Sequence, residues 1–151
     1  MKVDYSDIFS VQTKKQNLDI EEVITAFFST TPKWIDNLFE LRHKIVALLG
    51  LKTNSNTTIE FNYPLQAGEK IGFFEIFEVS ETEIILGEND THLDFRVSVR
   101  IEKENQISVE TLVEFKNFFG KTYFQIIKPF HKLIVASMLK RMLKKLESNK
   151  K

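Results

Sequence analysis

The feature that most constrains the fold is a run of alternating apolar and polar residues, Phe73 to Lys116, that leads into one long amphipathic segment, Lys121 to Leu146. Alternation with a period of two places successive side chains on opposite faces of a strand. Each predicted strand therefore has one apolar and one polar face, which is typical of an antiparallel sheet covered on a single side. We predict an α+β fold in which a curled antiparallel sheet is closed by a C-terminal helix.

The register of this sheet follows from the segment His92 to Lys103, where the alternation is strict. Two strands precede it, Phe73 to Val79 and Glu83 to Gly87, with a turn at Glu88 to Asp90. A second turn at Glu104 and Asn105 returns the chain as a strand from Ile107 to Lys116. The residues expected beneath the helix are Leu93, Phe95, Val97, Val99, Val109 and Val113, and those expected on the opposite face are Arg96 and Arg100.

The N-terminal part of the chain predicts one strand and two short helices. Residues Asp7 to Gln12 alternate, which indicates a first strand. Asp19 has the character of an N-cap for a first helix. Thr31 and Pro32 indicate the start of a second helix, which carries Trp34 and ends at Gly50.

The segment Leu51 to Ile71 is polar and long for a loop, with an edge strand predicted at Thr58 to Tyr63. Long connections in compact domains are usually lids or mobile segments. We expect this loop to be mobile and to cover a groove between the sheet and the terminal helix.

The terminal helix contains a proline, Pro129, within its predicted length. One apolar face continues across it, made of Tyr123, Phe124, Ile127, His131, Ile134, Val135, Met138 and Met142. A helix that started afresh at the proline would have no reason to keep this phase. We therefore predict one helix that is bent at Pro129, where the ring clashes with the carbonyl group of Gln125.

Charge is balanced overall but uneven along the chain. Lys and Arg total 21, as do Asp and Glu, so no net charge favours binding to nucleic acid or to a membrane. Residues 128–151 hold eight Lys or Arg and one acid, Glu147, whereas residues 1–127 hold thirteen Lys or Arg and twenty acids. Cations suit the C-terminal end of a helix, and a phosphate- or membrane-binding tail is the alternative.

Composition excludes several classes of protein. The chain has no cysteine, so it has no disulfide bonds, thiol chemistry or Cys-based zinc site. Its N-terminus lacks the apolar core of a signal peptide, and no apolar run approaches the ~20 residues of a membrane span. We expect one soluble, cytoplasmic domain, residues 1–151, with no nucleic-acid partner and no stable membrane insertion.

His131 is the leading candidate for a functional side chain. It lies in the middle of the helix's apolar face, where an imidazole could hydrogen-bond a ligand or act as a general base. The alternative is a core histidine bonded to a neighbouring group. Asp90, His92 and Asp94 resemble a metal site in spacing. Their predicted face is the solvated one, however, so we expect no metal and no cofactor.

Other candidates carry two interpretations each. Trp34 and Arg42 could enter the groove or pack and pair at its rim. Tyr63 and Tyr123 could line a pocket or be core aromatics with a solvated hydroxyl group. The 14 phenylalanines indicate either an aromatic-lined pocket or an ordinary core.

The segments Glu83 to Gly87, His92 to Val99, Gly120 to Tyr123 and Pro129 to His131 give the chain a resemblance to a known superfamily. It resembles the START-like (SRPBCC) superfamily, and within it a bacterial family of uncharacterised function. The resemblance implies a helix-grip fold. It also implies a cavity for apolar small molecules, with a few cyclases or hydrolases among the members. Some relatives are fused to dehydrogenase domains, which implies a dehydrogenase as a partner.

Together these observations predict a small-molecule-binding module that holds a moderately apolar or amphipathic ligand between the sheet and the terminal helix. The predicted ligand-binding residues are His131, Phe95, Val97, Val113, Phe74, Tyr123 and Trp34. One alternative is a cyclase- or hydrolase-like enzyme that uses His131 as general base, with a carboxylate such as Glu75. The other is an interaction or accessory domain with a filled core.

Overall fold

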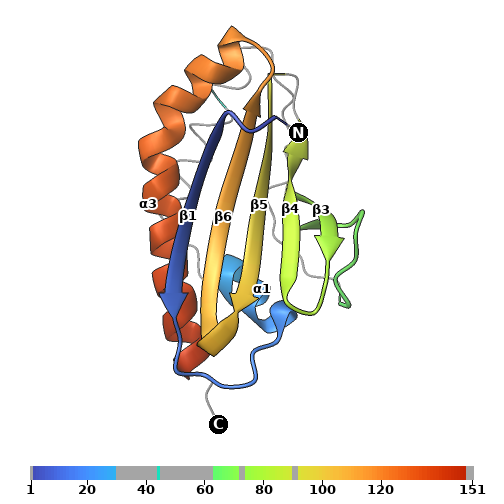
Figure 1. The fold of residues 1–151 in the computed structure, drawn as a ribbon, viewed down its shortest axis with the longest axis vertical. Helices are drawn as coiled ribbons and strands as arrows, with labels where there is room; N and C mark the ends of the chain where they lie inside the picture. The colour runs from blue at the N-terminus through green and yellow to red at the C-terminus, as the bar shows by residue number, and fades with distance from the viewer. Residues whose placement is uncertain (1, 30–43, 45–62, 72–73, 90–91, 149–151) are drawn as a thin grey trace.

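The computed structural model describes residues 2–29, 44, 63–71, 74–89 and 92–148. It has an α+β fold in which a curled, six-stranded antiparallel sheet is flanked by a long C-terminal helix (Figure 1). The strands are β1 (Tyr5–Gln12), β2 (Lys70–Ile71), β3 (Phe74–Val79), β4 (Glu83–Asn89), β5 (Leu93–Glu102) and β6 (Gln106–Phe115). The helices are α1 (Ile20–Ser29), the 3-10 turn η1 (Lys103–Asn105) and α3 (Phe118–Ser148). The strand order is β1-β6-β5-β4-β3-β2, so the first strand lies at one edge beside β6.

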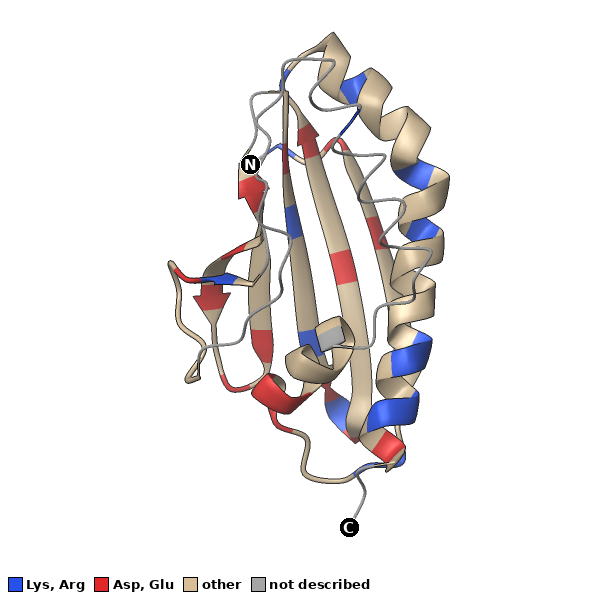
Figure 2. Ribbon diagram, turned by 180° about the vertical axis from the view of Figure 1, so that it is seen from behind, with Lys and Arg blue, Asp and Glu red and all other residues tan. Residues whose placement is uncertain are grey.

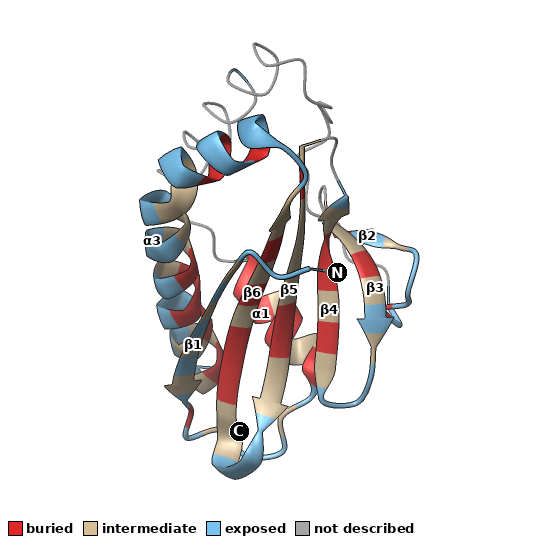
Figure 3. Cartoon of the chain, turned by 45° about the horizontal axis from the view of Figure 1, so that its top comes forward, coloured by how far each residue is buried: buried red, intermediate tan, exposed pale blue. Residues whose placement is uncertain are grey.

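The predicted register of the central strands is confirmed. β5 pairs with β6 so that Val99 lies opposite Val109 and Phe95 lies opposite Val113. Leu93 and Val113 pack with Tyr123 and Phe124 of α3, and Val99 and Val109 belong to the cluster that contains the C-terminal half of α3. Figure 3 shows buried residues along the middle of β4, β5 and β6 and on the side of α3 that faces the sheet. Two expected core residues, Phe95 and Val97, are only half-buried.

The sheet has one apolar face towards α3, here called the inner face, and one polar face. On the polar face Arg100 contacts Glu110 across the strands at 2.8 Å. Asp94 pairs with Lys116 at 3.0 Å. Arg96 stacks on the ring of Phe77, 3.8 Å from its centroid. Figure 2 shows the cations gathered along α3 and the acids mainly on the sheet and α1.

The terminal helix is continuous across Pro129, as the phase of its apolar face predicts. It begins at Phe118 rather than at about Lys121, because Asn117 caps it: the Asn117 side-chain oxygen accepts a hydrogen bond from the backbone N–H of Gly120 at 3.0 Å. Pro129 itself is exposed. On the solvent side of a helix, water can bond to a carbonyl group that a proline leaves without its usual donor.

Two glycines are required by close backbone contacts. A side-chain carbon at Gly87 would lie 2.0 Å from the carbonyl oxygen of Phe95, and one at Gly120 would lie 2.0 Å from that of His92. Gly87 therefore permits the β4–β5 pairing, and Gly120 lets the start of α3 sit against the beginning of β5. Both glycines belong to the segments that carry the family resemblance, and their role is in the fold.

Several predictions need correction, and others concern residues outside those described. Glu88 and Asn89 belong to β4 and not to the turn predicted at Glu88 to Asp90. The turn at Glu104 and Asn105 is confirmed, with φ values of 61° and 60°. The predicted second helix, apart from the helical Lys44, and the edge strand Thr58 to Tyr63, apart from Tyr63, lie outside the described residues, as do residues 51–62 of the predicted loop Leu51 to Ile71. The last two residues of that predicted loop, Lys70 and Ile71, form strand β2. Within the described part of the chain, no helix is both long and apolar enough to cross a membrane.

Candidate functional site

Four polar side chains meet on the inner face where β1, β6 and α3 come together. Tyr5 and Asp7 come from β1, Thr111 from β6 and His131 from α3. Asp7 and Thr111 are cross-strand partners. The Tyr5 hydroxyl group donates to Asp7 Oδ2 at 2.5 Å, and His131 Nε2 lies 3.4 Å from the same oxygen. We call these four residues the inner polar cluster.

The alternation of β1 places Asp7 in this position. Burial along β1 alternates strictly, with Tyr5, Asp7, Phe9 and Val11 on the less exposed side. Phe9 and Val11 pack against the core. Asp7 shares their face because it stands two residues before Phe9. A carboxylate therefore lies on the apolar side of an otherwise ordinary amphipathic strand.

The inner polar cluster separates two apolar clusters. One cluster contains Phe124 of α3 with Val113 of β6, and Tyr5 packs against it. The other contains Val135 of α3 with Val109 of β6, and Phe9 packs against it. Along each of the three elements, the polar residue stands between members of these two clusters. The core is thus interrupted by a polar layer at the level of Asp7, Thr111 and His131.

Three atoms of the cluster are buried without a hydrogen-bond partner among the described residues: Asp7 Oδ1, Thr111 Oγ1 and His131 Nε2. The 3.4 Å approach of His131 to Asp7 is within ion-pair range but is not a hydrogen bond. A buried polar group left unpaired typically costs about 1–3 kcal/mol. Proteins therefore pair nearly all such groups with protein, ordered water or ligand. These three atoms are therefore exceptions to the usual pairing of buried polar groups.

The electrostatics of the cluster follow from its burial. Burial lowers the pKa of His131 below its ordinary value, Lys132 contributes in the same direction, and the nearby charge of Asp7 opposes the shift without reversing it. The imidazole is therefore neutral at neutral pH. Burial, followed by the hydrogen bond to Asp7 and the charge of that carboxylate, raises the pKa of Tyr5. Tyr5 therefore stays protonated and continues to donate to Asp7.

The walls of the cluster are aromatic, and parts of the His131 and Asp7 side chains reach solvent although the three unpaired atoms are buried. The ring of Phe124 lies 4.6 Å from that of Tyr5 and 6.3 Å from that of His131, between centroids. The side chains of His131 and Asp7 retain 20% and 13% of their exposed area. Phe95 and Val97, on the inner face of β5, are also half-buried. An apolar surface with a few polar groups is the usual composition of a small-molecule site.

The structure places the predicted site residues as follows. His131, Phe95, Val97 and Val113 all lie on the inner side of their elements. Phe74 packs against Phe95, with ring centroids 5.6 Å apart. Tyr123 is buried beside Leu93, and Trp34 lies outside the described residues. The carboxylate close to His131 is that of Asp7 and not that of Glu75. Glu75 lies opposite Gly87, and Gly87 lies opposite Arg96, so Glu75 belongs to the polar face of the sheet.

Sequence reasoning missed Tyr5, Asp7 and Thr111. The signal for Asp7 was available, because it shares the parity of Phe9 and Val11 in the alternating segment. Thr111 likewise shares the parity of Val109 and Val113. What the sequence did not give was the adjacency of β1 to β6, which brings these two residues together.

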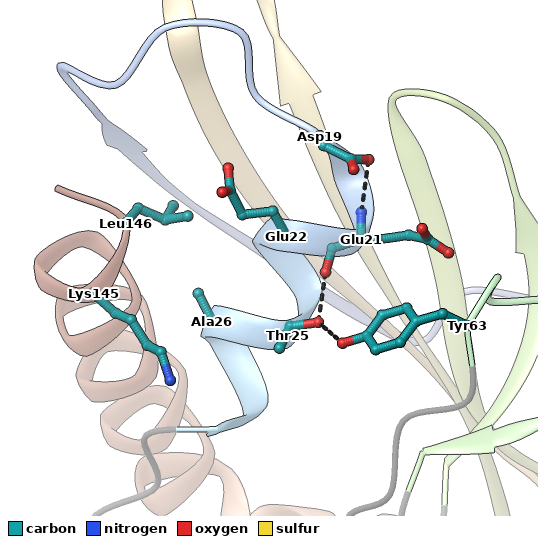
Figure 4. Close-up of a pocket in the computed structure, with 8 residues that line it drawn as sticks. All are labelled: Asp19, Glu21, Glu22, Thr25, Ala26, Tyr63, Lys145 and Leu146. Carbon is teal, nitrogen blue, oxygen red and sulfur yellow. Dashed lines mark hydrogen bonds between the residues drawn. The ribbon is translucent and has the colours of Figure 1, made fainter. Parts of the chain in front are cut away.

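A separate pocket of about 360 Å³ lies between α1 and the C-terminal end of α3 (Figure 4). It is lined by Asp19, Glu21, Glu22, Thr25, Ala26, Tyr63, Lys145 and Leu146. Its carboxylates have structural roles: Glu21 accepts from the backbone N–H of Leu65 at 2.7 Å, and Glu22 pairs with Lys15 at 2.7 Å. Asp19 accepts from the backbone N–H of Glu21 at the start of α1. The contacts of these carboxylates hold α1 in place, and His131 does not line this pocket.

The chain was compared with known protein families, curated proteins and solved structures. A family model described as "Protein of unknown function (DUF2867)" matches residues 1–138, a range that includes all four residues of the cluster. No curated protein and no solved structure is significantly similar to the chain.

Proposed function

Because the chain belongs to the DUF2867 family of proteins of unknown function, we propose its function from the inner polar cluster: it is a small-molecule-binding module. The ligand is moderately apolar or amphipathic and lies between the sheet and α3. The observation that carries this proposal is the set of three buried, unpaired polar atoms of Asp7, Thr111 and His131. They are buried beside the aromatic rings of Tyr5 and Phe124, and the side chains of Asp7 and His131 that carry two of them are partly exposed.

The finer description of the fold belongs to the same proposal. A curled antiparallel sheet with a long C-terminal helix along its inner face is compatible with the helix-grip fold of the START-like superfamily. That fold includes a second N-terminal helix, which we place at residues 31–50, and we retain the prediction that α3 bends at Pro129. We also retain the prediction that the connection after the second helix borders the opening of the pocket.

A second function is favoured by one specific contact, the approach of His131 to Asp7. A neutral imidazole beside a carboxylate has the parts of a general base, since the carboxylate stabilises the imidazolium ion formed when the base accepts a proton. The alternative is therefore a cyclase- or hydrolase-like enzyme in which His131 is the base. An accessory domain with a filled core, such as a partner of a dehydrogenase, agrees less well with the inner polar cluster, because unpaired polar atoms destabilise a filled core.

Native mass spectrometry of the protein as purified from cells tests the binding function. We expect a bound small molecule, and its mass gives its chemical class. The variants His131→Ala and His131→Gln should weaken retention of that molecule. The matched control is His92→Gln, because His92 lies at the end of the sheet, where its ring contacts Asn117.

The two functions differ in what the His131 variants do to the bound molecule. If the wild-type protein converts the molecule and His131→Gln binds it without turnover, the enzyme alternative is correct. If no molecule is bound and none of a broad library binds, the binding function is wrong.

A further inference from the structure

The three unpaired atoms of the inner polar cluster define what a ligand must offer. Asp7 Oδ1 can only accept hydrogen bonds, and a neutral His131 can accept at Nε2 when its proton is on Nδ1. The Thr111 hydroxyl group can accept as well as donate. None of the described residues donates to any of these atoms. A complementary group is therefore rich in donors.

The charges around Asp7 indicate which charge the ligand group should carry. Among the described residues, no Lys or Arg nitrogen lies within ion-pair distance of Asp7, whose one ion-pair contact is His131. Burial keeps that histidine neutral at neutral pH. Two cations lie nearby: Lys128, whose Nζ lies over the ring of Tyr5, 5.1 Å from the centroid, and the exposed Lys132, whose charge lowers the pKa of His131. The carboxylate of Asp7 is thus left without a cation in a buried setting, which disfavours an anionic ligand and favours a cationic one.

The surrounding rings accept a cation as well as an apolar body. Lys128 already contacts the ring of Tyr5 in this way, and cations are attracted to aromatic faces. Phe124 packs between Tyr5 and Phe115, with centroids 4.6 and 5.7 Å away. Phe95 and Val97 offer half-buried apolar surface further along the sheet.

We propose that the ligand of this protein is an apolar amine whose primary ammonium group is held by Asp7, Thr111 and His131. A primary ammonium group has three N–H donors and no acceptor, which matches the three unpaired atoms in number and in sense. An alcohol offers one donor, and a carboxylate offers none. The apolar body lies along Phe124, Phe95 and Val97. This inference rests on the proposed binding function and specifies its ligand.

The test uses three probes of the same shape: 2-phenylethylamine, 2-phenylethanol and phenylacetate. Isothermal titration calorimetry measures the affinity for each probe. The titrations are run at pH 8, where the amine is charged and His131 is neutral. We expect the amine to bind at least about tenfold more tightly than the alcohol, because a hydrogen bond to a charged group is stronger than a neutral one. Phenylacetate should bind most weakly of the three, because its charge repels Asp7.

Two variants locate the interaction. Asp7→Asn should remove the preference for the amine while leaving alcohol binding within about threefold, since the shape of the site is kept and its charge is lost. Thr111→Val keeps the shape and should weaken amine binding about three- to tenfold, the equivalent of one hydrogen bond. Glu114→Gln is the control, because it removes a carboxylate on the polar face of the same strand. It should leave the affinities for all three probes unchanged.

The outcomes separate the two proposals. Equal binding of the three probes, or a preference for phenylacetate, overturns the ammonium assignment and leaves a ligand-binding groove. An amine preference that survives Asp7→Asn places the amine elsewhere and also overturns the assignment. If no probe binds the wild-type protein at millimolar concentration, the assignment is wrong. If native mass spectrometry also finds no bound molecule, the binding function fails with it.

Discussion

Replacing Thr111 by valine should make the ligand-free protein more stable. Thr111 is 2% exposed, and its Oγ1 has no hydrogen-bond partner among the described residues. Valine has nearly the same shape, and position 111 is flanked on β5 by the apolar Val97. The substitution therefore removes an unpaired buried hydroxyl group without leaving a cavity. Such a group costs about 1–3 kcal/mol, so we expect a gain of about 1 kcal/mol in the free energy of unfolding.

Thr13 provides a matched control of the same residue type and the same burial. It is also 2% exposed, but its hydroxyl group donates to Glu147 at 3.3 Å and accepts from the backbone N–H of Lys15 at 3.1 Å. Thr13→Val removes two hydrogen bonds and should destabilise the protein by about 1 kcal/mol or more. The two variants are chemically identical substitutions with opposite expected signs.

Urea denaturation followed by circular dichroism measures both variants. A change in the midpoint with an unchanged slope reports stability alone. For a chain of this length, a gain of about 1 kcal/mol raises the melting temperature by ~2–4 °C. If Thr111→Val destabilises the protein as much as Thr13→Val does, the hydroxyl group of Thr111 is already bonded, for example to an ordered water. The claim that the cluster is open to a ligand group would then be wrong.

Three further predictions concern pH and packing. Because burial lowers the pKa of His131, the unfolded chain binds a proton there more readily than the folded protein, so stability should fall as pH drops below ~6.5, by at most about 1.4 kcal/mol per unit. His131→Gln should flatten this part of the urea-midpoint profile, and His92→Gln should not; equal slopes in the two variants would contradict a buried neutral His131. Because the pKa of Tyr5 is raised, its contribution to stability is complete below pH ~10 and is lost above it. Tyr5→Phe should therefore reduce the alkaline loss of stability and remove from the absorbance profile a phenol that titrates above its ordinary range; an unchanged profile would refute the shift. Gly120→Ala should destabilise the protein by about 3 kcal/mol or more, since its side-chain carbon would meet a backbone oxygen at 2.0 Å; a urea midpoint close to that of the wild type would show that the start of α3 can move away from β5.

Much of the fold was predictable because its pattern is local. The strict alternation of β5 fixes which residues face α3, since a shift by one residue would bury Arg96 and Arg100. The phase of the apolar face across Pro129 likewise predicts one helix instead of two. The sequence predicts a start near Lys121, whereas α3 begins at Phe118, directly after its capping residue Asn117. Asn117 lies in the short connection between β6 and α3, where an asparagine is equally typical of a turn.

The candidate site was predictable only in part, for a physical reason. His131 stands out because a titratable residue interrupts an apolar helical face. Asp7 was taken as the boundary of a strand that in fact begins at Tyr5. Thr111 does not stand out as a candidate site residue, because threonine is common in strands. The meeting of these residues depends on β1 pairing with β6 at the edge of the sheet, and this long-range pairing has no local sequence signal.

The inner polar cluster is difficult to explain by stability alone. A domain of this size has a net stability of about 5–15 kcal/mol. Three unpaired buried atoms at about 1–3 kcal/mol each remove a substantial part of it. Apolar residues at positions 7, 111 and 131 would join the two apolar clusters into one continuous core. A chain that keeps a carboxylate, a hydroxyl group and an imidazole there gives up stability at one level of its core, and the ligand group that we propose would restore this stability on binding.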